Sequence, residues 1–255
     1  MSLSFIALGI GDAFSALHYG ACLAVEHRDD TGPKWLLIDC PHPIRKMLRE
    51  GGLTAEAPGL DVRDFEGMVL IHLHADHPSG LEGWGFFHHF ALQRPAVVLT
   101  HPQVARDLWS ALAPSMSVLL SGPERVEQKF SEADFFDVRT FVDETTLGPF
   151  TVRCRTTWHH IPTIALTVSA GGLTLGYSAD TAFDPALVDW LADADLIVHE
   201  TNLGGAHTPY PQLAALPADL RAKMRLIAFP DGFDPERLTP GTHIEQLVQG
   251  QRYVV

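Results

Sequence analysis

The stretch "IHLHADHPSG", residues 71–80, places three histidines and one aspartate within six consecutive residues. Side chains two positions apart on an extended chain point the same way, so His72 and His74 can bind one metal ion together. Asp76 and His77 are adjacent, and both can reach a second ion if the backbone turns at the following Pro-Ser-Gly. Imidazole and carboxylate ligands favour zinc, iron or manganese. The alternative, a solvated histidine-rich loop, does not explain this spacing directly after an apolar run.

Short apolar runs alternate with turn residues along the whole chain, without an internal repeat or a low-complexity segment. We expect strands over residues 3–10, 21–27, 34–39, 67–71, 96–100, 150–157, 164–170, 173–179, 195–200 and 225–229. We expect helices over residues 43–52, 102–113, 185–194 and 216–224. Residues 114–147 are more polar and irregular, which is typical of a lid or an insertion. Because strands and helices fill both halves, the pattern predicts one α/β sandwich domain over residues 1–255.

Composition and charge narrow the class of protein and its partners. The 255 residues carry 18 basic and 31 acidic side chains, a net charge of −13 that argues against a long nucleic acid as partner. No apolar run is long enough to span a bilayer, and no secretion signal is recognisable. Three widely spaced cysteines favour reduced, buried thiols in a cytoplasmic protein. We therefore expect a small-molecule substrate and no membrane, and we leave a homodimer open.

The opening stretch also resembles a known signature. "HLHADHPSG" is similar to the H-x-H-x-D-H-x-x-G motif of the metallo-β-lactamase fold hydrolases. "GIGDAFS", residues 9–15, and "LLIDC", residues 36–40, resemble segments of the ribonuclease Z-like branch, although Pro41 replaces a usual glycine. The resemblance implies a four-layer αββα sandwich with a dinuclear metal site along the outer edge of two packed sheets.

The same resemblance implies two further ligands from the second half of the chain. "HHIPT" matches the branch's H-x-V-P-S pattern with His159 as ligand, which leaves His160 out of register and pointing elsewhere. "GYSADTAF" resembles its YSGDT segment, so Asp180 would bridge the two metals. The alternative for Asp180 is a cap on the helix expected over residues 185–194.

A third segment, "HETNLGGAHT", residues 199–208, resembles the HEAT-like region of ribonuclease Z and the histidine that follows it. The resemblance implies that His207 protonates the leaving group, a role that suits a group with a pKa near operating pH. The alternative is a plain surface histidine.

The chain departs from the family pattern at its last metal ligand. The branch closes its second metal site with a histidine after the last core strand, but this chain reads "RLIAFPDGFD" there, residues 225–234. We expect Asp231 to substitute, so that Asp76, His77, Asp180 and Asp231 form the second site. The alternatives are His243, a water, a weakened second metal, or a simple turn role for Asp231 in "PDG".

Together these observations predict a metal-dependent hydrolase with two divalent transition-metal ions, Zn, Mn or Fe. A metal-activated hydroxide would attack the substrate, with Asp76 orienting it. The branch resemblance points to a phosphodiester in a small substrate, such as a cyclic nucleotide. The alternatives are a carboxylic ester, thioester or lactone hydrolase of the same fold, and a non-catalytic protein that binds a metal or a ligand.

Overall fold

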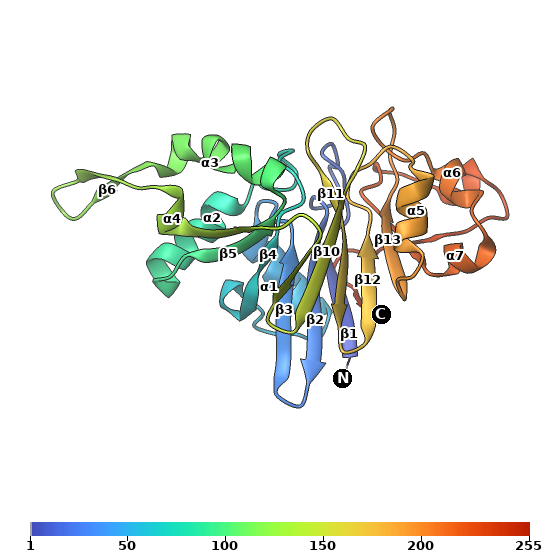
Figure 1. Ribbon diagram of the computed structural model, residues 1–255, viewed down its shortest axis with the longest axis horizontal. Coiled ribbons are helices and arrows are strands. Elements are labelled where there is room, and N and C mark those ends of the chain that lie inside the picture. The colour runs from blue at the N-terminus through green and yellow to red at the C-terminus, as the bar shows by residue number, and fades with distance from the viewer. Residues whose placement is uncertain (1) are drawn as a thin grey trace.

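Two seven-stranded mixed sheets lie at the centre of the computed structural model, which describes residues 2–255 (Figure 1). The first sheet has the order β16 (Arg252–Val254), β1 (Ser2–Gly9), β2 (Cys22–Asp29), β3 (Gly32–Ile38), β4 (Phe65–Val69), β5 (Ala96–Thr100) and β8 (Phe136–Thr140). The second has the order β15 (Glu245–Gln246), β14 (Met224–Ile227), β13 (Leu196–Glu200), β12 (Leu173–Tyr177), β11 (Ile164–Ala170), β10 (Phe150–Thr156) and β9 (Glu144–Leu147).

Helices cover the outer face of each sheet, and the result is the α/β sandwich expected from the sequence (Figure 1). The first sheet is covered by α1 (Ile44–Thr54), α2 (Leu81–Phe86) with its π-helical continuation η2 (Phe87–Leu92), α3 (Pro102–Met116) and α4 (Glu132–Phe135). The second carries α5 (Pro185–Leu191), α6 (Tyr210–Ala214) and α7 (Ala218–Ala222). A short 3-10 helix η1 (Val62–Asp64) precedes β4, and α8 (Pro235–Leu238) follows β14.

The pleat of β1 shows why a sheet covered on both faces is apolar throughout. Leu3, Phe5 and Ala7 pack between the sheets, whereas Ile6 and Leu8 pack against the helices. Alternate side chains of a strand point to opposite faces, so both sets must be apolar. The continuous hydrophobic run of β1 is thus the expected signature of a central strand with two buried faces.

Parallel pairing brings the functional segments to one edge of the sandwich. Strands β3, β4, β5 and β8 run parallel in the first sheet, and β12, β13, β14 and β15 run parallel in the second. The carboxyl ends of parallel strands lie at the same edge of a sheet. Strand β10 runs in the same direction as β12, because both are antiparallel to β11. The loops that follow β3, β4, β10, β12 and β13 therefore converge at this edge, and all the metal-ligand candidates except Asp231, which follows β14, lie on these loops.

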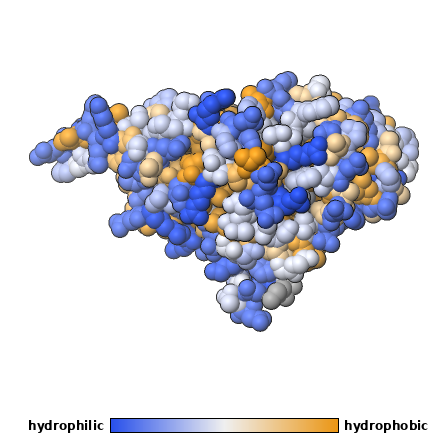
Figure 2. Space-filling view, viewed as in Figure 1, coloured by the Kyte–Doolittle hydropathy of each residue, from blue (hydrophilic) through white to orange (hydrophobic). Residues whose placement is uncertain are grey.

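Residues 114–147 are more regular than the sequence predicts. They include β8 and β9, which extend the two sheets, and the hairpin of β6 (Val118–Ser121) and β7 (Val126–Lys129), which forms a separate two-stranded sheet. This hairpin projects from the sandwich as an arm (Figure 1). Its apolar side chains are exposed, and apolar colour is visible at that end of Figure 2.

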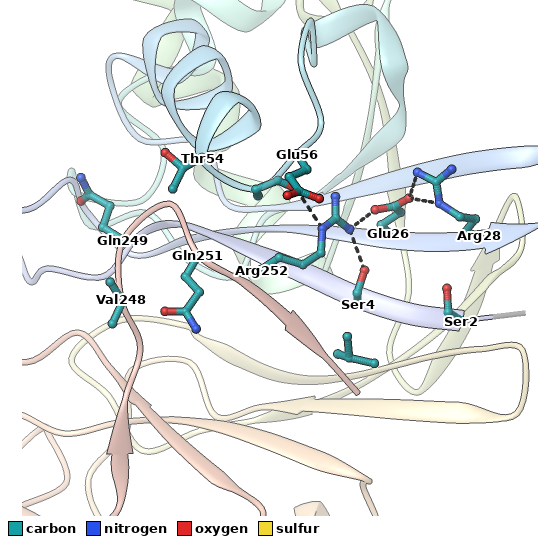
Figure 3. A pocket seen from close by; sticks show the side chains of 12 residues that line it. Ser2, Ser4, Glu26, Arg28, Thr54, Glu56, Val248, Gln249, Gln251 and Arg252 are labelled. Atoms are coloured by element: carbon teal, nitrogen blue, oxygen red, sulfur yellow. Dashed lines mark hydrogen bonds and ion pairs between the residues drawn. The ribbon is translucent and has the colours of Figure 1, made fainter.

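The C-terminal strand pairs with β1, and its Arg252 also contacts side chains of β1 and β2 beside a cavity of about 580 Å³ (Figure 3). Arg252 donates through Nε to the Ala55 carbonyl, and through Nη1 to Ser4 Oγ and to the buried Glu26 carboxylate. Arg28 also pairs with Glu26. Because the buried Glu26 carboxylate already has two arginine partners, we assign this cluster a structural role.

Two further expectations concern the whole chain. Cys22, Cys40 and Cys154 are buried free thiols, as the sequence predicts. Across residues 2–255, none of the helices combines the length and the apolarity that crossing a bilayer requires.

Candidate metal centre

The histidine-rich stretch leaves β4 and turns back at residues 74–80 before α2 begins. The turn is tied to the end of β3, because Gly80 N donates to the Cys40 carbonyl at 2.7 Å and Cys40 N donates to the His77 carbonyl at 2.9 Å. A Cβ on Gly80 would lie 2.6 Å from the Pro41 carbonyl oxygen. Only glycine permits this close approach, which explains the glycine that ends the motif.

A first group of ligand atoms forms where this turn meets the loops after β10 and β12. His72, His74, His159 and Asp180 each offer one atom, and these atoms all lie within 4.8 Å of one another. His159 Nε2 lies 2.9 Å from His74 Nδ1, and Asp180 Oδ2 lies 3.8 Å from both His72 Nε2 and His159 Nε2. His159 and Asp180, which come from two separate motifs, therefore lie beside His72 and His74 of the opening stretch.

A second group lies on the other side of Asp180. His77 Nε2 is 3.7 Å from Asp180 Oδ1 and 3.4 Å from Asp76 Oδ2. The two Asp180 oxygens thus face different groups, the arrangement that a bridging carboxylate requires. The helix-capping alternative for Asp180 is wrong, because Asp184 caps α5 by accepting from Ala186 N.

The donor set fits divalent transition-metal ions. Burial lowers the pKa of His72 well below its usual value and also lowers the pKa of His74 and His159, so these rings are neutral and keep a lone pair for a metal. Both ring nitrogens of His72, together with His77 Nε2 and Asp180 Oδ1, are buried without a hydrogen-bond partner in the described chain. Orphaned buried polar atoms are costly, and cations between them would satisfy them.

Asp39 orients the second group, although sequence reasoning assigned it no role. It directly follows β3, is fully buried, and has a positive φ of 61°. Its Oδ2 lies 2.7 Å from His77 Nδ1, and its Oδ1 accepts from Ile71 N at 3.0 Å. This contact directs His77 Nε2 toward Asp76 and Asp180. The only sequence signal for Asp39 was the resemblance of "LLIDC".

Charge around His77 matches a cation site. Burial alone would lower the His77 pKa, but the carboxylates of Asp39 and Asp180 raise it well above its usual value. Burial also opposes ionisation of Asp76, yet the His77 ring, 3.4 Å away, lowers the Asp76 pKa. The second group is therefore an acidic pocket that favours a positive charge on or beside His77.

The structure places Asp231 away from these groups. Its carboxylate accepts from Ser15 Oγ at 2.5 Å and from Ala16 N at 2.7 Å, on the loop between β1 and β2. The Ser15 hydrogen bond lowers the Asp231 pKa. Asp231 therefore fastens this loop, and the gathered ligand atoms do not include it. His243, the other candidate, is exposed between α8 and β15.

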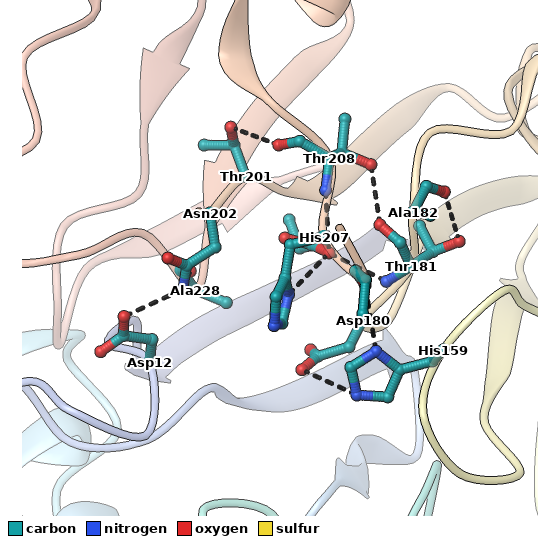
Figure 4. Close-up of polar contacts among 12 residues, drawn as sticks. Asp12, His159, Asp180, Thr181, Ala182, Thr201, Asn202, His207, Thr208 and Ala228 are labelled. Carbon is teal, nitrogen blue, oxygen red and sulfur yellow. Dashed lines mark hydrogen bonds and ion pairs between the residues drawn. The ribbon is translucent and has the colours of Figure 1, made fainter. Parts of the chain in front are cut away.

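His207 lies beside His159 and Asp180 (Figure 4), and it is paired with the buried Glu200. His207 Nδ1 lies 3.1 Å from Glu200 Oε1, which also accepts from Thr181 N and Thr208 N. Burial raises the Glu200 pKa to about 7, and the bond to Glu200 raises the His207 pKa. The His207 ring centroid is 5.3 Å from that of His159. His207, the expected proton donor, thus lies beside the metal-ligand cluster, and the Glu200 carboxylate orients its ring.

Curated relatives cover almost the whole chain. The chain is 26% identical over 268 residues to Anti-Pycsar protein Apyc1 of Bacillus phage 010DV004, covering 100% of this chain and 99% of the relative. It is 28% identical over 257 residues to Apyc1 of Saccharibacillus brassicae, covering 97% and 98%. A cAMP/cGMP-dependent 3′,5′-cAMP/cGMP phosphodiesterase B of Dictyostelium discoideum is 24% identical over 187 residues, covering 66% of this chain and 16% of that protein.

Solved structures share the fold. The metallo-β-lactamase fold protein YhfI of Bacillus subtilis superposes with a TM-score of 0.77 and 15% identity, covering 100% of both chains. Zinc-bound PqqB of Methylobacterium extorquens superposes with a TM-score of 0.72 and 12% identity, covering 99% and 100%. The expected fold is confirmed. Since the model of the Anti-Pycsar protein Apyc1 family matches residues 3–253, the chain belongs to that family.

Proposed function

We propose that this protein is a metal-dependent phosphodiesterase that hydrolyses a small phosphodiester of the cyclic-nucleotide class. The observation that carries the proposal is the position of Asp180 between two ligand groups, with the His207–Glu200 pair beside them. The family of Apyc1 proteins and the phosphodiesterase of Dictyostelium discoideum support the same class of reaction.

In this proposal His72, His74, His159 and Asp180 would hold one divalent ion, and Asp76, His77 and Asp180 would hold a second. Bound divalent ions supply Lewis-acid stabilisation of phosphate oxygens and lower the pKa of water. Asp76 is ionised, because the nearby His77 ring outweighs burial and lowers the Asp76 pKa, and its carboxylate can accept a hydrogen bond from the attacking water. Asp39 holds His77 in place from behind.

His207 would deliver the proton to the leaving oxygen. Its Nδ1 is bonded to Glu200, so its Nε2 remains for the substrate. The bond to Glu200 raises the His207 pKa and favours the doubly protonated ring, which can donate from Nε2. Glu200 therefore acts as a positioning residue that fixes the orientation of the general acid.

The test is a parallel screen of the protein with added Mn or Zn on 3′,5′-cyclic nucleotides, bis(p-nitrophenyl) phosphate, a lactone and a glutathione thioester. We expect turnover of the phosphodiesters alone, abolished by His74→Ala and retained by His101→Asn. His101 precedes α3 as its N-cap, a role that asparagine fills, and therefore serves as a matched control. Turnover of only the lactone or thioester would refute the phosphodiester assignment, and silence on all substrates would favour a binding protein.

A further inference from the structure

A cavity of about 540 Å³ opens directly beside the metal-ligand cluster. Its lining includes His159, the adjacent Trp158 and His160, and the Gly205–Ala206 segment of the loop after β13. His159 links the two spaces, because its Nδ1 lies 3.1 Å from the Ala206 carbonyl while its Nε2 faces His74 and Asp180. A substrate with its phosphate at the ligand cluster would therefore extend into this cavity.

Trp158 presents an exposed indole on a fixed backbone. Its relative exposure is 66%, whereas Trp84 in the core is 1% exposed. The Trp158 carbonyl accepts from Ala182 N at 2.7 Å, which ties the residue to the loop that carries Asp180. The backbone of Trp158 is thus held next to two metal-ligand residues, while its indole is exposed and available to a ligand.

The other walls leave room for a flat group. A Cβ on Gly205 would meet no atom within 4 Å, so this part of the loop leaves open space. The His160 ring lies 5.2 Å from the His159 ring and 6.1 Å from the His74 ring, and it can offer a polar contact between the indole and the metal-ligand cluster. A volume of this size accommodates a ligand in the range that small-molecule pockets hold.

Positively charged side chains do not supply the affinity of this cavity for an anionic substrate. Its lining, within the part of the chain that the structure describes, contains neither lysine nor arginine, and the chain as a whole carries a net charge of −13. An anionic substrate therefore needs an uncharged attraction outside its phosphate. Stacking on an indole gives such an attraction to any aromatic base, because every base has a π-face.

We propose that this cavity is the subsite for the aromatic base of the substrate, with the base stacked on Trp158. The proposal rests on the phosphodiesterase function above and names Trp158 as a specificity-determining residue. His160 contributes a polar contact at the sugar side of the same cavity.

The test compares kcat/KM of the metal-loaded protein for two kinds of substrate. One is the most rapidly hydrolysed of the 3′,5′-cyclic nucleotides of adenine, guanine, cytosine and uracil. The other is a 3′,5′-cyclic phosphate of 1-deoxyribose, which lacks a base. We expect Trp158→Ala to lower the ratio of the two kcat/KM values by about tenfold or more, the scale of one lost base stack. Trp158→Phe should retain part of the preference.

Leu120→Ala on the β6–β7 arm is the matched control, because Leu120 is 67% exposed and does not line the cavity. It should leave the ratio unchanged. An unchanged ratio in Trp158→Ala would overturn the subsite, and so would an equal loss on both substrates together with lost metal, since Trp158 would then only support His159.

Failure of the subsite and failure of the function are distinguishable. If the wild-type protein hydrolyses neither substrate, the phosphodiesterase proposal fails. The subsite is then tested by quenching of tryptophan fluorescence with adenosine. Quenching in the wild type that disappears in Trp158→Ala supports base stacking, and equal behaviour of the two proteins refutes it.

Discussion

Replacing Asp39 by asparagine tests whether its buried carboxylate, which contacts His77, controls metal binding by the second ligand group. The two Asp39 oxygens have separate partners, His77 Nδ1 at 2.7 Å and Ile71 N at 3.0 Å. Asparagine keeps the shape but replaces one acceptor with an NH₂ donor. The amide oxygen will take the Ile71 N–H, so the NH₂ group must face His77 Nδ1.

The consequence is a change of tautomer. His77 Nδ1 can meet an NH₂ donor only as an acceptor, which moves the ring proton to Nε2, the atom that faces Asp76 and Asp180. A protonated Nε2 cannot bind a metal. Loss of such an outer hydrogen bond lowers metal affinity by about 10- to 100-fold, or about 1.4 to 2.7 kcal/mol. If His77 keeps its tautomer instead, two donors face each other at a cost of about 1 to 3 kcal/mol in stability.

The assay is a titration of chelator-stripped protein with Zn²⁺ in competition with a chromophoric chelator, together with a urea melt of the metal-free protein. We expect Asp39→Asn to weaken one class of site by the stated factor while sites that use His72 and His74 keep wild-type affinity. Asp137→Asn, which removes an exposed ion pair with Arg139, is the control. Wild-type affinity at every site and wild-type stability in Asp39→Asn would refute the reasoning.

Three other predictions follow from the described contacts. His207→Gln should lower kcat by about 10²- to 10⁴-fold at unchanged metal content, as expected for a lost general acid; a wild-type kcat would exclude that role. Burial depresses the His88 pKa to about 4, so below about pH 6.5 only the unfolded chain gains this proton. Between pH 7 and pH 5, the free energy of unfolding should therefore drop by about 2 kcal/mol more in the wild type than in His88→Phe. Urea melts at the two pH values measure this difference, and His243→Gln, at an exposed position, is the control. Asp231→Ala should keep metal content, measured by elemental analysis, but should speed proteolysis within residues 11–20, because the Ser15 and Ala16 contacts are lost; lost metal would instead restore Asp231 as a ligand.

The parts of the fold that the sequence predicts are those with a strong local pattern. The strands of the two sheets carry apolar runs or alternation, and all ten expected strand segments overlap an observed strand. The β6–β7 hairpin was missed because nearly all of its residues are exposed, so no period of two marks its strands. Its pairing depends on hydrogen bonds between the two strands rather than on a buried face.

The candidate site also has residues that the sequence pattern predicts and residues that it does not. The spacing of His72, His74, Asp76 and His77 carries its chemistry within six residues, so it is readable without a fold. Asp39 and Glu200 act through partners that only the folded chain brings near. Asp39 contacts a histidine 38 residues away, and no spacing rule links them.

Asp231 shows how a local pattern can mislead. Its position after the last core strand matched the place of the family's last histidine. The structure brings Ser15, 216 residues away in sequence, against its carboxylate. At the end of β14, Ala228 has a positive φ of 55°, and its carbonyl accepts from the Asn202 side chain. The backbone at this position is therefore held by hydrogen bonds to a neighbouring loop, and its side chain offers no ligand atom.

Without that last histidine, the two groups differ in their number of protein ligands. This difference is compatible with catalysis. The first group has four ligand atoms, three of them from neutral imidazoles, which is a complete set for a tetrahedral ion. Among residues 2–255, the second group comprises Asp76, His77 and the shared Asp180. Three protein ligands with one open position are the usual composition of a catalytic zinc site, because the open position admits water or substrate. The lost ligand therefore lowers the affinity expected of the second group without removing its chemistry. With three protein ligands, the metal affinity of the second group depends strongly on the orientation of His77. Because Asp39 fixes that orientation, replacing Asp39 should lower the metal affinity of the second group before that of the first.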